Sequence, residues 1–307
     1  MKKKSLWQEI RKNYFFYLLA LPGLIFLIMF NYTPIAGIYL AFEKYTFEGG
    51  LFGSEFVGLH NFRILFARID DVIRATRNTL VLNMGEILFG TVLNVAVAII
   101  LSEINNERYR KITQTFVLFP HFLSWIVIGT VSDALLDDDA GLINQIIQLF
   151  GGEAVAWSMN AKYWWAIIII VSIWKNFGYQ SIVYYATVTG FDPGLYEAAE
   201  IDGASRLRRV WSITLPLLTP TIIIMLLLSI GNIMRGSLEQ IMGMTKLSPF
   251  ILETTDTITT YVYRIGMAGG NFGNASAVSL YQSIFGCVFV LGANMIVKKI
   301  DPDYALF

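Results

Sequence analysis

The feature of this sequence that most constrains its fold is a series of apolar blocks long enough to cross a lipid bilayer. Six such blocks lie at 14–39, 79–101, 113–135, 162–187, 215–234 and 276–297. A transmembrane helix needs about 20 apolar residues to cross a hydrocarbon layer of about 30 Å. Only 15% of the residues are charged, whereas soluble domains contain about 25%. The sequence therefore predicts an all-α polytopic membrane protein with six transmembrane helices.

The distribution of basic residues predicts which side of the membrane each loop faces. Lysine and arginine gather at both ends of the chain, between the second and third blocks, and before the fifth: Lys2, Lys3, Lys4, Arg11, Lys12, Arg108, Arg110, Lys111, Arg206, Arg208, Arg209, Lys298 and Lys299. Short basic segments face the cytoplasm, so both termini are expected there. The segment from Glu43 to Arg77 also holds five basic residues, but it is long and contains five acidic ones, so it counts for less.

Three segments are then expected outside the membrane on the other face: 40–78, 136–161 and 235–275. The first contains FVGLHNFRILFARIDDVIRATRN, whose apolar residues recur at near-helical spacing, and this predicts an amphipathic helix at the membrane interface. The third is rich in glycine, threonine and asparagine, and we expect little regular structure in it.

A charged, helix-forming segment, EAAEIDGASRLRRVWSITLP at 197–216, precedes the fifth apolar block. Asp192 and Pro193 favour a helix start before it, and Gly203 permits the left-handed turn that would end this helix. A second helix over Ser205–Ile213 would carry several apolar residues on one face: Leu207, Val210, Trp211 and Thr214. The pattern alone fits equally well a connector packed on lipid or on its own bundle and a segment that docks onto a partner.

The same segment resembles the EAA signature of binding-protein-dependent ABC importer permeases. The matching positions are Glu197, Ala198, Ala199, Asp202, Gly203, Ala204, Ile213, Leu215, Pro216 and Pro220. Val210 departs from the signature, which often has phenylalanine there. Other stretches resemble the sugar-type permeases, in particular the branch that serves complex oligosaccharides and polysaccharides: RKNYFFYLLALPGLIFLIMFNYTPIAGIYLAF, FVGLHNF, GLIN at 141–144 and FGNASAVSLYQSIFGCVFVLGANMIVKKI. The resemblance covers most of the chain.

The resemblance implies a domain arrangement and a coupling mechanism. Residues 14–300 would form the six-helix permease domain, with an EAA coupling loop at 191–216 and cytoplasmic tails at 1–13 and 301–307. In this family the EAA segment forms coupling helices seated in a groove of a separate ATPase subunit. The residues expected to couple are Glu197, Ala198, Ala199, Asp202, Gly203, Leu207, Val210 and Trp211. The arginines of the segment could face either the ATPase or lipid phosphates.

The resemblance also implies partners and a location. The chain would sit in a bacterial plasma membrane with a second permease, expected to be a different chain, and with two copies of an ABC ATPase. An extracellular substrate-binding lipoprotein would deliver an oligosaccharide. The sequence has no G-x-x-x-x-G-K-[ST] phosphate loop. We therefore expect ATP and Mg to be bound by the partner ATPase, with no cofactor and no enzymatic activity in this chain.

Polar residues within the apolar blocks predict a substrate path, because such groups are costly in lipid and tend to face a cavity or the bundle interior. The candidates are Asn83, Glu86, Asn94, Trp174, Lys175, Asn176, Tyr179, Asn232, Arg235, Tyr281 and Gln282. Aromatic faces beside amides and carboxylates suit a sugar, which offers apolar ring faces and many hydroxyls. An asparagine inside a membrane also commonly links helices, and Glu86 and Lys175 could simply neutralise each other.

Two other functions remain open. An ion-coupled secondary carrier often shows inverted repeats and broken helices at matching positions, and the sequence shows neither. An integral-membrane enzyme would need a catalytic group, but His60 and His121 lie in no H-E-x-x-H pattern. The run Asp137–Asp139 is expected to be a solvated loop, and Cys287 is the only cysteine. We therefore expect no metal site, and the net charge of zero suggests no nucleic-acid partner.

Overall fold

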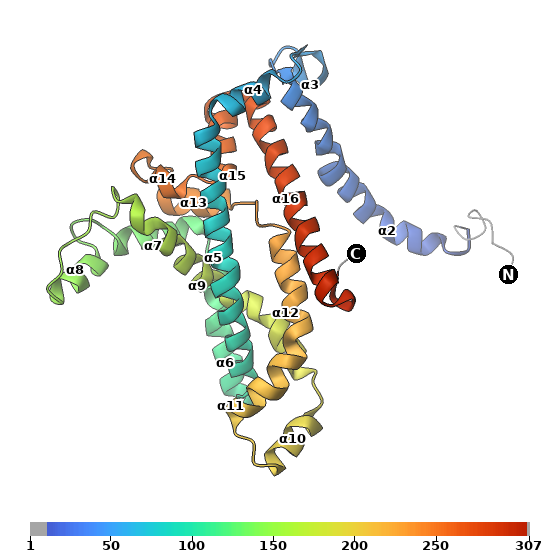
Figure 1. Ribbon diagram of the computed structural model, residues 1–307, viewed down its shortest axis with the longest axis vertical. Coiled ribbons are helices and arrows are strands. Elements are labelled where there is room, and N and C mark those ends of the chain that lie inside the picture. Colours follow the sequence, from blue (N-terminus) through green and yellow to red (C-terminus); the bar gives the residue numbers. More distant parts are fainter. Residues whose placement is uncertain (1–10, 306–307) are drawn as a thin grey trace. The chain divides into compact units, whose positions relative to one another are not determined.

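The computed structural model describes residues 11–305, so the outer parts of the expected tails at 1–13 and 301–307 lie outside the described residues. Within this range the chain is almost entirely helical (Figure 1). The strands found there, β1 (Glu43–Lys44) and β2 (Glu55–Phe56), pair in an antiparallel hairpin. The contacts divide the chain into two compact units, Met1–Ala67 with Ile265–Leu280 and Arg68–Arg264 with Tyr281–Phe307.

The first unit begins with an apolar helix that runs from Tyr14 to Phe42. Along its length the helix changes from α to π and then to 3-10 geometry. It is followed by the hairpin, which has one short helix between its two strands, and by a second short helix. The elements are α2 (Tyr14–Leu27), a π-helical turn (Ile28–Tyr32), a 3-10 segment (Thr33–Phe42), β1, α3 (Gly50–Gly53), β2 and α4 (His60–Ala67). The start of α16 (Phe272–Ile300) completes this unit.

The second unit is built around two long helices, α5 (Ile69–Ser102) and α9 (Trp164–Thr189), which pack along each other. Its other elements are α6 (Glu107–Leu118), a 3-10 turn (Phe119–Phe122), α7 (Trp125–Leu135), α8 (Leu142–Leu149), a 3-10 turn (Ala161–Tyr163), α10 (Pro193–Ile201), α11 (Arg206–Arg209), a π-helical turn (Val210–Thr214), α12 (Leu215–Ile230), α13 (Leu238–Thr245), a 3-10 turn (Pro249–Ile251), α14 (Leu252–Thr255), α15 (Ile258–Tyr263) and, at the C-terminus, a 3-10 turn (Pro302–Tyr304). A further π-helical turn (Arg264–Ala268) belongs to the first unit from Ile265 onward.

Apolar side chains of α5 and α9 form two buried clusters with their neighbours. One contains Val95, Ala98, Tyr184, Val188 and Leu218, and the other Leu82, Trp164, Ile168, Ile241, Met244 and Ile251. Gly178 allows α6 to approach α9, because a Cβ on this glycine would lie 2.0 Å from the carbonyl oxygen of Val117.

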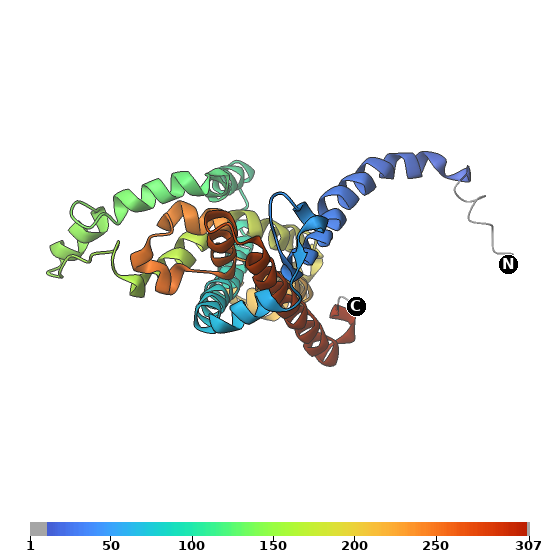
Figure 2. The same cartoon turned by 90° about the horizontal axis from the view of Figure 1, so that it is seen from above.

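The prediction of a polytopic all-helical membrane protein is confirmed. The described residues contain five helices that are long and apolar enough to span a membrane, or six if a bent pair counts as one span. That pair lies at the predicted third span, 113–135, so the prediction of one continuous helix there is wrong. The chain bends by 92° between Glu107–Phe122 and Trp125–Leu135, and Figure 2 shows α7 running sideways from α6.

Three features account for this bend. Pro120 removes a backbone donor from the turn that ends α6. Ser124 then caps the new helix by accepting a hydrogen bond from the Val127 N–H at 3.3 Å. The buried Lys175 of α9 satisfies the carbonyls freed at the break, since its Nζ donates to the oxygens of His121 and Leu123 at 2.6 Å each.

The expectation of little regular structure at 235–275 is also wrong. This segment contains α13, α14 and α15, each of eight residues or fewer. Its threonines cap helices: Thr257 and Thr260 form a reciprocal capping box at the start of α15. Buried isoleucines hold these short helices against the unit's core. The composition suggested a loop because glycine and threonine are frequent in it and its buried apolar residues are widely spaced.

Candidate functional site: a helical elbow and a polar cavity

The charged segment at 191–216 forms a sharp elbow, and the predicted helix–glycine–helix geometry is confirmed (Figure 1). Helix α10 begins where expected, with the Asp192 side chain accepting a hydrogen bond from the Gly194 N–H at 2.9 Å and Pro193 at the first helical position. Gly203 has φ of +75°. This left-handed conformation is easy for glycine and strained for residues with a Cβ.

The turn at Gly203 satisfies the carbonyls at the end of α10. The Gly203 N–H donates to the Glu200 oxygen at 3.0 Å, and the Ala204 N–H donates to the Ala199 oxygen at 2.9 Å. This pair of bonds is the Schellman arrangement, which closes a helix on a residue in the left-handed region. The direction in which the chain leaves α10 is therefore fixed by hydrogen bonds.

The second limb of the elbow is continuous with the fifth membrane span. The helix from Arg206 to Ile230 has no break and includes a π-helical turn at Val210–Thr214. The prediction of a helix over Ser205–Ile213 that leads directly into the fifth span is therefore confirmed, and only the predicted start of the span at 215 is too late. The ring of Pro216 would clash with the Ser212 carbonyl in a regular helix, and a wider turn accommodates the proline without ending the helix.

Two side-chain contacts brace the limbs against each other. The Tyr196 hydroxyl of α10 lies 3.1 Å from Thr214 Oγ1. Arg209 donates to Glu200 Oε2 at 3.0 Å. Because Glu200 is largely exposed, this ion pair contributes at most about 1 kcal/mol, but it restricts the angle between the limbs. The sequence left open whether the arginines face the ATPase or lipid phosphates, and the structure pairs Arg209 with Glu200 of the same chain.

The elbow exposes large apolar side chains. Ile201, Leu207 and Trp211 are 87%, 73% and 70% exposed. Thr214 is buried, so its predicted place on the Leu207–Trp211 face is wrong, because the π-helical turn rotates the positions that follow it. Of the other predicted coupling residues, Glu197, Ala198, Asp202 and Gly203 are exposed, and Ala199 and Val210 are half-buried. Ile201 was missing from the predicted coupling residues. Its position near the end of α10, two residues before the glycine that ends the helix, could have indicated an exposed apolar side chain.

A polar cavity of about 340 Å³ lies within the second unit among α5, α9 and the end of α12. It is lined by Asn83, Glu86, Ile87, Thr91, Gln180, Leu228, Ser229, Asn232 and Arg235. Three predicted path residues, Asn83, Glu86 and Asn232, therefore come together here, and Asn176 lies beside them with its Nδ2 3.5 Å from Glu86 Oε1. Arg235, another polar candidate at the end of the fifth span, also lines it, whereas Gln180, which lines it too, was absent from the predicted path.

Some of these polar groups also link helices. Asn83 Nδ2 donates to the carbonyl oxygens of Ile233 and Arg235 at 2.8 and 3.0 Å. Asn94 Nδ2 donates to Gln180 Oε1 at 2.8 Å. The amide of Asn83 thus holds the irregular stretch after α12 against α5 and borders the cavity at the same time.

The remaining predicted path residues do not line this cavity. Lys175 is bound to carbonyl oxygens at the α6–α7 break, and among the described residues it forms no ion pair with Glu86. Tyr179 stacks on His121 with ring centroids 4.3 Å apart, and Trp174 is exposed. The other two bind polar atoms elsewhere, Tyr281 at the Thr76 hydroxyl and Gln282 at the Met234 carbonyl.

The acidic run Asp137–Asp139 stabilises its own loop. Asp137 accepts hydrogen bonds from the N–H groups of Ala140 at 2.8 Å and Asp139 at 3.1 Å, and these bonds lower the pKa of Asp137. Asp138 accepts from the Ser158 side chain and N–H. Elsewhere outside the spans, burial raises the pKa of Asp256, although Arg264 and Arg74 oppose this effect.

Comparisons with known proteins show which family this chain resembles in sequence and in structure. Residues 87–304 match the family described as the binding-protein-dependent transport system inner membrane component. The polygalacturonan/rhamnogalacturonan transport system permease protein YteP of Bacillus subtilis (strain 168) is 36% identical over 98% of this chain and 93% of its own length. Protein LplB of the same organism is 35% identical over 96% of this chain and 92% of its own.

A solved structure has the same fold. This chain is similar, with a TM-score of 0.85 and 32% identity, to a chain of a bacterial ABC transporter involved in the import of the acidic polysaccharide alginate, over 97% of this chain and 100% of the other. A second structure of an alginate ABC transporter, in complex with an alginate pentasaccharide-bound periplasmic protein, also gives 0.85 and 32%, over 97% and 98% of the two chains.

Proposed function

The chain belongs to the family of binding-protein-dependent transport system inner membrane components, and from this premise we propose that it is the permease subunit of an ATP-driven importer of oligosaccharides or polysaccharide fragments. The chain is a multi-pass membrane component, as its family and its apolar helices indicate. In our proposal residues 14–300 form the permease domain, and both termini and the 191–216 elbow face the cytoplasm of a bacterium.

One observation carries the proposal: the elbow is braced, exposes apolar side chains and continues without a break into a membrane span. A protein groove that covers Ile201, Leu207 and Trp211 would bury them, and each fully buried apolar side chain of this size contributes about 1.5–3 kcal/mol. Because the second limb and the span are one helix, a displacement of the docked elbow would move the span directly.

The motor is a separate subunit in this proposal. Two copies of an ABC ATPase bind ATP and Mg and close on them, and the closure moves the elbow and tilts the span. Glu197, Ala198, Ala199, Asp202, Gly203, Leu207, Val210 and Trp211 form the docking face, with small side chains at 198 and 199 allowing close approach of the partner.

The substrate path includes the polar cavity at Asn83, Glu86 and Asn232. Polar groups on three helices around one cavity offer donors and acceptors to the hydroxyls of a sugar. A second permease, expected to be a different chain, would complete the path, and an extracellular binding protein would deliver the substrate. The relatives named for polygalacturonan, rhamnogalacturonan and alginate support a glycan as cargo.

Co-purification tests the docking face. Ala198→Trp adds a bulky ring to an exposed position on α10 without filling a protein core, so the ATPase should be lost from the purified complex while the chain stays folded. Ala154→Trp is the matched control, since it adds the same ring to an exposed position in the loop that we assign to the opposite side of the membrane. If Ala198→Trp retains the ATPase and transports as the wild type does, the docking assignment is wrong.

A further inference from the structure

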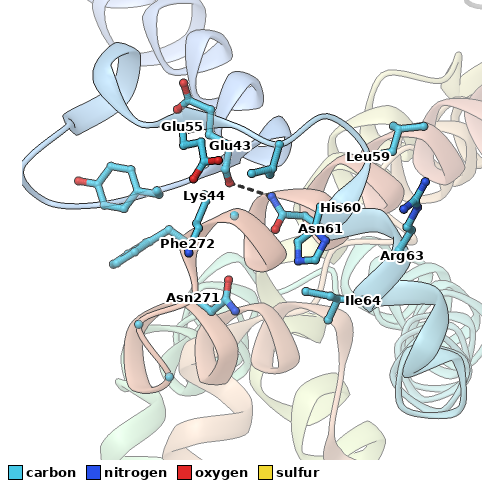
Figure 3. A pocket seen from close by; sticks show the side chains of 15 residues that line it. Glu43, Lys44, Glu55, Leu59, His60, Asn61, Arg63, Ile64, Asn271 and Phe272 are labelled. Atoms are coloured by element: carbon cyan, nitrogen blue, oxygen red, sulfur yellow. Dashed lines mark hydrogen bonds between the residues drawn. The ribbon is translucent and has the colours of Figure 1, made fainter.

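The first unit contains a cavity of about 690 Å³ to which the proposed function assigns no role. Figure 3 shows it between the β1–β2 hairpin, α4 and the start of α16. All of its lining residues belong to the first unit, so its geometry does not depend on the second. Its volume falls within the range of about 300–1,000 Å³ that is typical of small-molecule sites.

The wall of this cavity is preformed. Asn61 is 5% exposed and its Nδ2 donates to the carbonyl oxygens of Ala41 and Glu43 at 3.0 and 2.9 Å. Gly273 packs so closely here that an added Cβ would lie 2.7 Å from both Asn61 Nδ2 and the Glu43 oxygen. The hairpin, α4 and α16 are thus locked together around the cavity.

A buried carboxylate in this wall lacks a hydrogen-bond donor. The Glu43 side chain lines the cavity, the residue is only 1% exposed, and its Oε2 has no hydrogen-bond partner among residues 11–305. A buried polar atom without a protein partner is costly, so the free acceptor of Glu43 can gain from a donor that a ligand brings. An oxygen acceptor requires a donor, and the hydroxyl groups of a sugar are donors.

Positive charge is also available at the cavity. Lys44 and Arg63 line it together with two carboxylates, Glu43 and Glu55. Within residues 11–305 neither cation forms an ion pair within 4 Å, so both remain available to a ligand. The N-terminus of α16, a helix of 29 residues, also borders the cavity, with Asn271 and Phe272 in its lining. The unpaired N–H groups at a helix N-terminus favour an anion, and a carboxylate would gain from both cations.

Aromatic rings supply an apolar surface. The rings of Tyr45 and Phe272 lie 5.3 Å apart at 69°, and Phe47 packs edge-on against Phe272 at 5.8 Å. This cluster fixes the orientation of Tyr45 and Phe272, both of which line the cavity. Fixed aromatic side chains provide a platform for the apolar face of a sugar ring.

The lining can thus bind hydroxyl groups, a carboxylate and an apolar ring face, and acidic sugars carry all three. We propose that this cavity binds an acidic oligosaccharide, with Glu43 accepting sugar hydroxyls, Lys44 and Arg63 binding a uronate carboxylate, and Tyr45 lying against a ring. The inference rests on the proposed function for the identity of the cargo as a glycan and for the outward position of the segment at 40–78. The site would hold a uronate chain before it enters the membrane path.

Calorimetry on the full-length chain in lipid nanodiscs, without ATPase or binding protein, tests the site, with trigalacturonate as the acidic probe and maltotriose as the neutral one. We expect trigalacturonate to bind more tightly, and its affinity to fall as salt screens the charges. Lys44→Gln should weaken the binding of trigalacturonate about tenfold or more, since it removes a charged donor to the uronate carboxylate. Glu43→Gln replaces an acceptor oxygen with an amide donor, so it should weaken the binding of both probes by leaving the sugar hydroxyls one acceptor fewer. Glu48→Gln, the same change on the hairpin loop but outside the lining, should leave the affinity unchanged.

Equal affinity for both probes, an unchanged affinity in Lys44→Gln, or no binding to the wild-type chain would overturn the proposal and leave the cavity as a surface for another protein. Lys44 is exposed, so its substitution leaves the fold intact even if Glu43→Gln unfolds the unit. Retention of the ATPase by the wild-type chain is measured in parallel. A chain that retains the ATPase but binds no trigalacturonate refutes only this site, whereas one that binds the probe but no ATPase refutes only the proposed function.

Discussion

Substitution of Gly203 isolates the contribution of backbone conformation to the elbow. This residue has φ of +75°, and a Cβ added there would meet no atom within 4 Å. A larger side chain therefore creates no clash with a neighbour, and its effect must come from the strain of a left-handed backbone. A residue with a Cβ loses about 1–2 kcal/mol in this conformation, and a β-branched residue lies at the upper end, while asparagine tolerates it well.

These energies predict a graded response. For Gly203→Val, a strain of about 1.4–2 kcal/mol reduces the population of the closed turn about 10- to 30-fold relative to alternative conformations. If the partner binds only the closed elbow, its apparent affinity falls by up to the same factor. Gly203→Asn should stay within about threefold of the wild type, because asparagine adopts the left-handed region at low cost.

The assay is titration of purified ATPase onto the reconstituted chain, followed by substrate-stimulated ATP hydrolysis. Gly151→Val is the matched control, since Gly151 has φ of +81° and equally open space in the loop after α8. The reasoning is refuted if Gly203→Val binds ATPase as the wild type does, if Gly203→Asn is as damaging as valine, or if Gly151→Val produces the same loss.

Three further predictions concern other contacts. Lys175→Met removes the donor to two carbonyl oxygens at the α6–α7 break and should lower the free energy of unfolding by about 2–4 kcal/mol, seen as a lower Tm in detergent. Tyr196→Phe removes the hydroxyl that meets Thr214 and should leave ATPase binding unchanged while lowering the substrate transported per ATP; an unchanged ratio would exclude the brace as a transmitter. Because hydrogen bonds lower the folded-state pKa of Asp137, its stabilisation is complete at neutral pH and is lost as the pH falls below the ordinary value of 3.8 and through the lowered one. The protection of amides in the 136–160 loop against hydrogen exchange, measured relative to the intrinsic rate at each pH, should therefore fall in acid, and Asp137→Asn should abolish that dependence.

The features that the sequence predicts well are those set by local chemistry. Apolar length alone predicts the five continuous membrane spans, and the pairing of Asp192 with Pro193 predicts the start of α10. Gly203 predicts the turn after α10, because few other residues adopt that conformation. Each of these signals acts within one helical turn or along one helix, so no knowledge of distant contacts is needed to read it.

The features that the sequence does not predict depend on contacts between distant segments. The break in the third span needs Lys175, which lies more than 50 residues beyond the carbonyls it binds. Within its own helix this lysine looks like a polar residue of the substrate path. Its partners become evident only when α9 packs beside the α6–α7 break. The same holds for Asn83, whose amide links α5 to backbone about 150 residues away.

These two residues show why polarity within a span is an incomplete guide to a substrate path. A buried polar side chain must find partners, and irregular backbone in a membrane also leaves carbonyl groups that need donors. Two of the three N–H donors of Lys175 bind such carbonyls, so it has little capacity left for a ligand. Glu86, in contrast, lines a cavity and meets Asn176 only at 3.5 Å, a weak hydrogen bond that a sugar hydroxyl can replace. Among the polar residues of the spans, those with unused hydrogen-bonding capacity that also border a cavity are the ones to expect on the path.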